Sequence, residues 1–390
     1  MNGVEARGNS VRVYFRYNGE LCREPVPGGN TEANRAQAKR LVDMIEYEVQ
    51  AGIFDYSRHF PNSSRLADNT FGHYLDLWLS IQKNNVAATT YRGYANKAEV
   101  HVRPMWGKKQ IDQIDHLDLQ QWIQSVLAAR LSNKTIRDIV SNVRQVFRLY
   151  RTRKKIAHDP TEGLQVRLPD PAAPDPFTRA EIAQILATPT SRTFELLMVQ
   201  FMIWAGPRVS ETIALAWEDV DLQAGTVTFR RSKVRGDYRV TKTRRSTRKV
   251  RLLAPALDAL SKLKAMTKGA KPQTVEVVQR DNRTVRQHKL HFVFLNTSSG
   301  EPHVSDFTIR DRFFKTHLEH AGVRYRGPGQ CRHTYASQLL SSGVASIDWI
   351  AEQMGHTNGN MIRKHYGTWI NEDGPDVIAM LEHALGMGAT

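Results

Sequence analysis

The stretch Phe194-Glu-Leu-Leu-Met-Val-Gln-Phe-Met-Ile-Trp-Ala-Gly-Pro-Arg-Val-Ser-Glu211 contains the longest apolar run of the chain. Its first twelve residues predict a helix, and Gly206-Pro207 interrupts the helical pattern before a second helix begins. Arg208 is therefore expected beside a helix start, where free backbone N–H groups favour an anion. A surface ion pair between Arg208 and Glu211 is the plainer alternative for the same residues.

Length and composition indicate an ordinary folded chain with a polyanionic partner. The 390 residues suffice for two or three domains. Hydrophobic residues make up 41% and charged residues 24%, a balance that excludes wholesale disorder. The net charge of +16 favours a partner such as nucleic acid. Two cysteines, Cys22 and Cys331, exclude a disulfide scaffold or a cysteine-rich zinc site.

The apolar run does not predict a membrane segment. Glu195 and Gln200 break it, and it is shorter than the roughly 20 residues that span a bilayer. The N-terminus also lacks the pattern of positive residues followed by an apolar core that marks a secretion signal. We therefore expect a soluble intracellular protein with no membrane partner.

The positive charge is concentrated in one short segment. Residues 230–251 hold 11 basic residues and one acidic residue. Such focusing is typical of a nucleic-acid contact surface, although a solvated basic hairpin without a partner remains the alternative. The candidate DNA-binding residues are Arg230, Arg231, Lys233, Arg235, Arg244, Arg245 and Arg248.

The N-terminal segment, residues 1–62, predicts a small sheet with one helix. Val11-Arg-Val-Tyr-Phe-Arg-Tyr17 alternates, Asn18-Gly19 is a strong hairpin signal, and residues 21–26 continue the pattern. Residues 31–51 predict a helix with Thr31 as N-cap and Gly52 as the stop. A stabilising cap on the next domain is the alternative to an independent function.

The rest of the chain divides at a proline-rich stretch. Residues 67–165 show helical spacing of apolar and aromatic residues, which predicts an all-α domain. Residues 166–176 include Pro-Asp-Pro-Ala-Ala-Pro-Asp-Pro and predict a linker. Residues 177–390 mix helices with strands at 226–230 and 248–253, after which helices are expected to dominate. The whole is therefore a multidomain α+β chain.

Two further stretches of the last segment carry reactive side chains. Arg332-His-Thr-Tyr-Ala-Ser337 places a second arginine at a predicted helix start. Gly355-His356 is followed ten residues later by Tyr366 in Lys-His-Tyr-Gly-Thr-Trp. Each has a structural alternative: His356 as a residue that ends a helix, or Tyr366 as half-buried core.

The ordered set of these motifs resembles the tyrosine recombinase, or phage-type integrase, family. The likeness covers residues 176–370 by motif and implies a mixed α/β catalytic domain at 177–390. Residues 67–165 resemble the family's core-binding domain, and residues 1–62 resemble the arm-type DNA-binding domain of phage integrases.

The resemblance implies DNA cleavage by phosphoryl transfer to a tyrosine. Tyr366 would be the nucleophile that forms a 3′-phosphotyrosine, so that rejoining needs no ATP. Arg208 and Arg332 would each fork onto the non-bridging phosphate oxygens, and His356 would donate a further hydrogen bond. Glu211 and His333 would support the arginines. We therefore expect no cofactor and no metal ion.

The catalytic lysine and the general base are less directly implied. Lys242, which precedes Thr243 and the strand ending in a Val-x-Leu-like run, fits the family's general acid, with Lys233 as the alternative. The family usually has a histidine where this chain has Gly329. His356, His333 or an ordered water would then assist deprotonation of Tyr366.

The resemblance predicts a site-specific recombinase that integrates, and excises, a phage or mobile element. Its partners would be double-stranded DNA attachment sites, bound as a homotetramer, with DNA-bending and excision accessory proteins. It would act on the nucleoid in the bacterial cytoplasm. A chromosome-resolution recombinase of the same chemistry and a DNA-binding protein without strand exchange are the alternatives.

Overall fold

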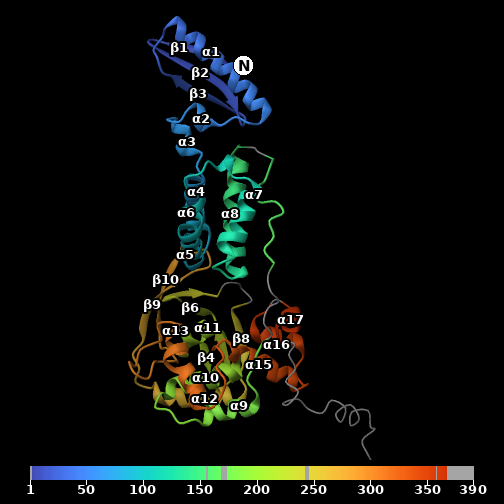
Figure 1. The fold of residues 1–390 in the computed structure, drawn as a ribbon. Coiled ribbons are helices and arrows are strands. Elements are labelled where there is room, and N and C mark those ends of the chain that lie inside the picture. Colours follow the sequence, from blue (N-terminus) through green and yellow to red (C-terminus); the bar gives the residue numbers. More distant parts are fainter. Residues whose placement is uncertain (1, 155–156, 168–173, 242–245, 357, 367–390) are drawn as a thin grey trace, which may run out of the picture. The chain divides into compact units, whose positions relative to one another are not determined.

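The computed structural model describes residues 2–154, 157–167, 174–241, 246–356 and 358–366. The chain divides into two compact units, Met1–Asp170 and Pro171–Thr390, each of which is described by itself (Figure 1). Among the helices of these described residues, none combines the length and the apolar character needed to cross a bilayer.

The first unit begins with a three-stranded antiparallel sheet. Strands β1 (Gly3–Arg7), β2 (Ser10–Tyr17) and β3 (Glu20–Val26) pair in that order. Asn18 and Gly19 connect β2 to β3 with φ values of 50° and 81°, the left-handed conformations that a tight two-residue hairpin turn requires. The predicted hairpin is confirmed.

Helix α1 (Glu32–Ala51) covers one face of this sheet (Figure 1). The Thr31 side chain accepts a hydrogen bond from the backbone N–H of Asn34, and Gly52 ends the helix with φ 73°, both as predicted. Alternate β2 residues meet one stripe of α1, and the shared core comprises Val11, Val13, Phe15, Ala38, Val42 and Ile45.

The remainder of the first unit is helical, as expected. Its longest helices are α4 (Phe71–Asn85) and α8 (Asn133–Lys154). The predicted aromatic residues form its core rather than a surface, since Phe71, Tyr74, Trp78, Trp122 and Phe147 are all buried. The other segments are α2 (Tyr56–His59), α3 (Ser64–Asp68), α5 (Ala88–Lys97), η1 (Ala98–Val102), α6 (Arg103–Trp106), η2 (Ile111–Gln113), α7 (His116–Gln121) and η3 (Trp122–Leu127).

The second unit is built around helix α10 (Thr193–Ala205), which the longest apolar run of the sequence forms. Its side chains are buried on nearly every face because it packs against α12 (Ala254–Met266) and α15 (Gln330–Ser341). Helix α9 (Arg179–Ala187) contributes Ile182 and Ile185 to the same core. The break after α10 leads into α11 (Val209–Ile213), followed by the short turn η4 (Trp217–Asp219).

Two small sheets lie in the second unit. One has the order β4 (Val220–Asp221), β5 (Thr226–Phe229), β8 (Arg248–Arg251), so the two predicted strands exist and pair with each other. The other has the order β10-β9-β7-β6, comprising β6 (Arg231–Val234), β7 (Asp237–Val240), β9 (Gln273–Val278) and β10 (Val285–Leu290).

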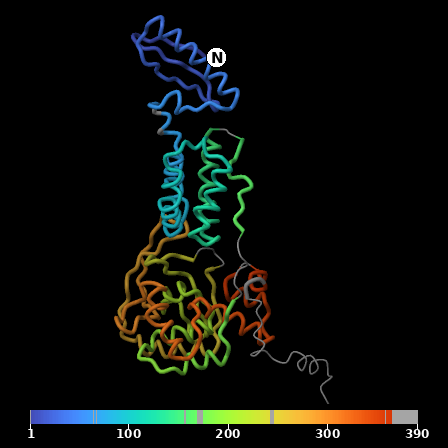
Figure 2. Tube along the Cα trace, in the orientation of Figure 1, coloured from blue at the N-terminus to red at the C-terminus, as the bar shows by residue number. Residues whose placement is uncertain are grey.

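The hairpin of β9 and β10 is an exception to the expectation that helices dominate after residue 253. Polar residues interrupt the apolar alternation of both strands, so the sequence pattern does not indicate them. Strand β9 pairs in parallel with β7, which lies more than thirty residues earlier in the chain. The closing helices are α13 (Asp306–Ile309), η5 (Arg310–Phe314), α14 (Lys315–His320), α15, α16 (Ile347–Met354) and α17 (Asn360–Tyr366). Helices α15, α16 and α17 pack together near the end of the described chain (Figure 2).

Candidate active site

The break between α10 and α11 sets the position of Arg208. Gly206 ends α10 with φ 68°, and a Cβ atom there would lie 2.4 Å from the Tyr335 ring, so only glycine fits. Glu211 is buried and accepts hydrogen bonds from the Arg208 backbone N–H and from its Nη1, both at 2.9 Å. The Arg208 side chain is nevertheless 46% exposed, so part of it remains accessible from solvent.

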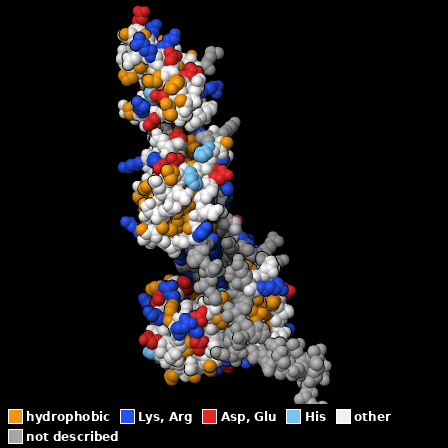
Figure 3. Space-filling view, turned by 45° about the vertical axis from the view of Figure 1, so that its right-hand side comes forward, with side chains coloured by type: hydrophobic (Ala, Val, Ile, Leu, Met, Phe, Trp, Pro, Cys, Tyr) orange, Lys and Arg blue, Asp and Glu red, His pale blue; other side chains and the backbone are white. Residues whose placement is uncertain are grey.

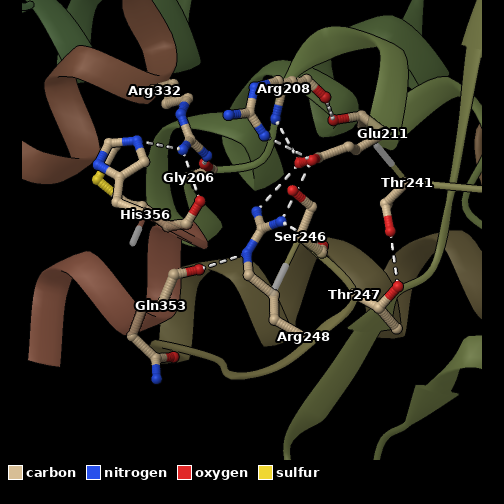
Figure 4. Close-up of polar contacts among 12 residues, drawn as sticks. Gly206, Arg208, Glu211, Thr241, Ser246, Thr247, Arg248, Arg332, Gln353 and His356 are labelled. Carbon is tan, nitrogen blue, oxygen red and sulfur yellow. Dashed lines mark hydrogen bonds and ion pairs between the residues drawn. The ribbon is translucent and has the colours of Figure 1, made fainter. Parts of the chain in front are cut away.

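Arg332, on α15, joins two distant turns. Its Nη1 donates to the carbonyl oxygen of Gly206 at 2.7 Å, and its Nη2 donates to the carbonyl oxygen of Met354 at 2.6 Å (Figure 4). The same Nη2 lies 2.9 Å from Nε2 of His356. Arg332 therefore ties the end of α10 to the end of α16, and its side chain is buried.

The contact with Arg332 determines the protonation pattern of His356. An arginine only donates hydrogen bonds, so Nε2 of His356 acts as the acceptor. In this arrangement the imidazole is neutral and carries its proton on Nδ1, a buried atom. Gly355, with φ 70°, ends α16 just before this residue, so His356 lies directly after a helix.

Arg248 is the third arginine of the cluster, and it lies at the start of β8. Its Nη1 and Nη2 donate to the two carboxylate oxygens of Glu211 at 3.2 and 3.0 Å, and its Nε donates to the carbonyl oxygen of Gln353 at 2.6 Å (Figure 4). The side chain is only 5% exposed. The prediction that Arg248 contacts DNA is therefore corrected, because its donors face protein carboxylate and carbonyl groups.

Glu211 is the anion at the centre of these contacts. Burial by itself would raise the pKa of its carboxyl group. The charge and hydrogen bonds of Arg248, followed by the charges of Arg332 and Arg208, outweigh that effect and lower the pKa below its usual value. The carboxylate is thus held ionised among three cations.

The basic hairpin of β6 and β7 divides into buried and exposed residues. Arg231 is buried in an ion pair with Asp219, so the prediction that it contacts DNA is corrected for the same reason as for Arg248. Arg230 also pairs with Asp219, at 2.7 Å, but its side chain is half exposed. Arg235 lies exposed at the turn, with φ 52°.

Lys233 has protein partners on the same hairpin. Its Nζ donates to the carbonyl oxygen of His303 at 2.9 Å and lies 4.6 Å from the centre of the Tyr238 ring. Burial lowers the pKa of its ammonium group. On the face drawn in Figure 3, basic side chains of the second unit lie among acidic ones.

Several predicted residues lie partly or wholly outside the described structure. Lys242, Arg244 and Arg245 fall in the segment 242–245, which is not described. Tyr366 is the last residue of α17, and only its backbone is described. His333 is half-buried beside Arg332 on α15. Within the described residues, no group of three or more His, Cys, Asp or Glu side chains is arranged to hold a metal ion.

Three backbone carbonyl groups of this site escaped the sequence analysis: that of Gln353, which accepts from Arg248, and those of Gly206 and Met354, which accept from Arg332. Backbone carbonyl groups are common to all residues, so the sequence carries no signal for them. The break at Gly206-Pro207 indicated a turn there, but not its partner. Arg248 was noted in the sequence only as one basic residue of a basic segment, and that pattern did not distinguish a contact with DNA from a buried ion pair.

Comparison with known proteins places this site in a family. The family model described as "Phage integrase family" matches residues 176–369, and its N-terminal SAM-like domain model matches residues 70–127. A third model, "Arm DNA-binding domain", matches residues 1–64. The chain is 30% identical to the prophage integrase IntR of Escherichia coli K12, over 98% of both chains.

The chain therefore belongs to the phage integrase family and is a tyrosine-type site-specific DNA recombinase. It is also 24% identical to the tyrosine recombinase XerC of Oceanobacillus iheyensis, over 76% of this chain and 89% of that one.

Solved structures share the fold. The Tn1549 transposon integrase in complex with a circular intermediate DNA superposes with a TM-score of 0.65 at 19% identity, over 81% of this chain and 99% of that one. A lambda integrase tetramer bound to a Holliday junction gives a TM-score of 0.55 at 15% identity, over 95% and 97%. The predicted fold class, with its small N-terminal sheet, helical domain and mixed catalytic domain, is confirmed.

Proposed function

We propose that this recombinase integrates and excises a phage or other mobile element by forming a 3′-phosphotyrosine at Tyr366. The observation that carries the proposal is a cluster of contacts from three separate elements: Arg332 contacts His356, and the charges of Arg332 and the part-exposed Arg208 both act on buried Glu211. Helix α17 packs on α15 and α16 and ends at Tyr366, which favours the tyrosine as the nucleophile of the same site.

The proposed reaction is a transesterification. The Tyr366 phenol oxygen attacks the scissile phosphorus, a new P–O bond forms, and the bond to the 5′-oxygen breaks. Arg208 and Arg332 stabilise the charge that gathers on the non-bridging oxygens. Lys242 gives its proton to the leaving 5′-oxygen, and Lys233 remains the alternative donor.

The contact between Arg332 and His356 supports a donor role for the histidine. Its Nε2 accepts from Arg332 in this arrangement, so donation to a phosphate oxygen would fall to Nδ1–H, whose nitrogen would have to become accessible when DNA binds. The proton of the Tyr366 phenol then passes to His333 or an ordered water. Because arginines neutralise the developing charge, cleavage is expected to proceed in EDTA, and a strict requirement for magnesium would contradict this scheme.

The proposal extends to the assembly and the domains. Residues 1–62 would bind arm-type sites, residues 67–165 would bind the core site, and residues 177–390 would cleave, with 166–176 as linker. The active species would be a homotetramer on two duplexes in the bacterial cytoplasm, helped by DNA-bending and excision proteins. Likeness to a lambda integrase tetramer on a Holliday junction supports this arrangement.

The test is covalent capture of a nicked suicide duplex that carries the core site of the element's junction. Tyr366→Phe removes only the phenol oxygen, so it should abolish the covalent complex and leave DNA binding near that of the wild type. Tyr325→Phe, at an exposed tyrosine of the same unit, is the matched control and should react normally. Covalent complex in Tyr366→Phe would assign the nucleophile elsewhere.

Chromosome resolution is the second candidate, because the chain is also similar to XerC recombinases. The match of residues 1–64 to an arm DNA-binding domain favours integration, since the resolution enzymes lack a separate arm-binding domain. An assay with two plasmids distinguishes the two functions. Recombination that requires an arm-containing site supports integration, whereas equal recombination of two core sites supports resolution.

A further inference from the structure

Arg248 holds a place in the active site that the proposed reaction leaves unused. It contributes no exposed donor to a substrate, since its side chain is 5% exposed and its guanidinium carbon lies 4.8 Å from the centre of the Phe229 ring. All three of its side-chain nitrogens donate to protein oxygen atoms. An arginine so placed acts on other residues, not on DNA.

One set of contacts leads from Arg248 to Arg208 through Glu211. Oε1 of Glu211 accepts from Nη1 of both arginines, at 2.9 Å for Arg208 and 3.2 Å for Arg248. Oε2 accepts from the Arg208 backbone N–H at 2.9 Å and from Nη2 of Arg248 at 3.0 Å. The two arginines therefore share one buried carboxylate, and Arg248 makes the bidentate pair with it.

A second set of contacts leads from Arg248 to the turn that carries His356. Nε donates to the carbonyl oxygen of Gln353, whose side-chain Oε1 accepts from the backbone N–H of Arg251. A Cβ atom at Gly355 would lie 2.9 Å from Cδ of Arg248, so the turn passes directly over this side chain. Two hydrogen bonds to Gln353, one from the Arg248 side chain and one from the Arg251 backbone, thus join strand β8 to the end of α16.

Removing Arg248 would change how strongly the Glu211 carboxylate competes with a DNA phosphate for the Arg208 side chain. Glu211 would keep its burial and lose its bidentate partner, and an uncompensated buried carboxylate is strongly unfavourable. The nearest remaining fork is that of Arg208, which would be drawn fully onto Glu211 and away from a phosphate.

We infer that Arg248 is a positioning residue for strand cleavage: it occupies Glu211, so that Arg208 stays available to the scissile phosphate, and it fixes the turn that presents His356. The inference rests on the phosphate-binding role proposed for Arg208. It replaces the role in DNA contact that the basic segment suggested.

The experiment compares single-turnover cleavage of two suicide duplexes, one with an ordinary scissile phosphodiester and one with a methylphosphonate there. A methyl group in place of a non-bridging oxygen removes the negative charge that Arg208 is proposed to neutralise. Arg208→Ala should therefore be severely slowed on the phosphodiester and largely recover on the methylphosphonate.

Arg248→Lys keeps the charge but not the two-pronged geometry. It should slow cleavage of the phosphodiester by about 10²-fold, as expected when a group that stabilises the transition state is misplaced by an ångström. It should recover on the methylphosphonate as Arg208→Ala does. DNA affinity should be unchanged. Arg251→Lys, at an exposed arginine of the same strand, is the matched control and should leave both rates near wild type.

Gly355→Ala is the second variant. Its Cβ would press on Arg248 Cδ, and alanine is also strained at the φ of 70° that Gly355 adopts, so we expect slower cleavage of the phosphodiester together with a lower melting temperature. Equal slowing on both substrates by Arg248→Lys would indicate general damage to the fold and overturn the inference. Weakened DNA binding in Arg248→Lys would overturn it in favour of a DNA contact, and unchanged cleavage of the phosphodiester would also overturn it.

The measurements on Arg208→Ala distinguish the role proposed for Arg208 from the positioning role inferred for Arg248. Rescue of Arg208→Ala without rescue of Arg248→Lys overturns the positioning role alone. If Arg208→Ala is not rescued by the methylphosphonate, the role proposed for Arg208 fails, and the inference that depends on it fails as well.

Discussion

At the residue scale, the backbone conformation of Gly329 shows whether glycine is required at this position. The position precedes α15 and has φ −60° and ψ −24°, which any residue adopts. No atom lies within 4 Å of a Cβ built there, and the residue is exposed. The glycine is therefore not required by a left-handed turn, and its lack of a side chain is a chemical difference from the family pattern.

Gly329→His tests whether that difference matters. We expect the substitution to change the free energy of unfolding by less than about 0.5 kcal/mol, as at an open surface position. We expect no gain in cleavage rate, because another group already accepts the Tyr366 proton. Single-turnover cleavage against pH, with thermal unfolding alongside, measures both. A gain approaching the 10²–10⁴-fold typical of general-base catalysis would instead show that the wild-type site lacks a base.

Glu211 gives a prediction on pH. Its folded-state pKa is lowered, so ionised Glu211 stabilises the fold above the ordinary glutamate pKa of 4.5, and that stabilisation is lost as the pH falls through the folded-state value. Glu211→Gln should therefore lower the melting temperature most at neutral pH, with a difference that shrinks in acid. The measurement is Tm against pH, with exposed Glu276→Gln as control. A difference independent of pH would contradict the ionic role.

At the scale of the element, strand β8 sorts its own charges. Its four residues, Arg-Lys-Val-Arg, alternate buried and exposed, so Arg248 and Val250 point inward while Lys249 and Arg251 point outward. Alternation was predictable from the strand itself. The burial of Arg248 was not, because its charge is paired by Glu211, which lies 37 residues earlier in the chain.

This sorting predicts how the basic segment affects the salt dependence of DNA binding. Neutralising Arg244 and Arg245 should reduce the slope of log K against log salt by about 0.9 for each phosphate that these side chains no longer neutralise. The same slope should be unchanged in Arg248→Lys, since that side chain is buried. Binding titrations at several salt concentrations measure it. An unchanged slope after neutralising Arg244 and Arg245 would mean that these two face solvent in the complex.

At the scale of the whole molecule, the first unit joins the N-terminal sheet and the helical domain in one compact body. Tyr17 of the N-terminal sheet donates to Asp112 of the helical part at 3.1 Å, and Glu20 pairs with Lys154 at 2.9 Å. Burial, followed by the charge of Asp112, raises the pKa of Tyr17, so this phenol stays protonated as a donor. The sheet is thus anchored to the helices by specific polar contacts.

Deleting residues 1–62 should separate two proposed functions, the binding of arm-type sites and the cleavage of the core site. We expect core-site cleavage to persist, because the helical core is closed without the sheet, and integration of an arm-containing site to be lost. The truncated protein should unfold at a lower temperature, since Asp112 and Lys154 lose their partners. Cleavage and integration assays on the same preparation test this. Loss of core-site binding would support the alternative that the segment is a stabilising cap.

The sequence by itself determined what depends on near neighbours along the chain. The hairpin at Asn18-Gly19, the helix between Thr31 and Gly52, and the break after α10 follow from turn and cap preferences that act over a few residues. The family followed from the order of short motifs. The β9 and β10 hairpin did not follow, because its pairing partner is distant.

Only the tertiary structure decided which of the described basic residues are exposed and which are buried. Arg231 and Arg248 have the same composition around them as their exposed neighbours, yet each meets a carboxylate from a distant segment, Asp219 or Glu211. A guanidinium group is buried where a carboxylate pairs with it, because an unpaired charge in the interior is too costly. Whether a carboxylate lies beside a given arginine depends on the folding of the whole unit.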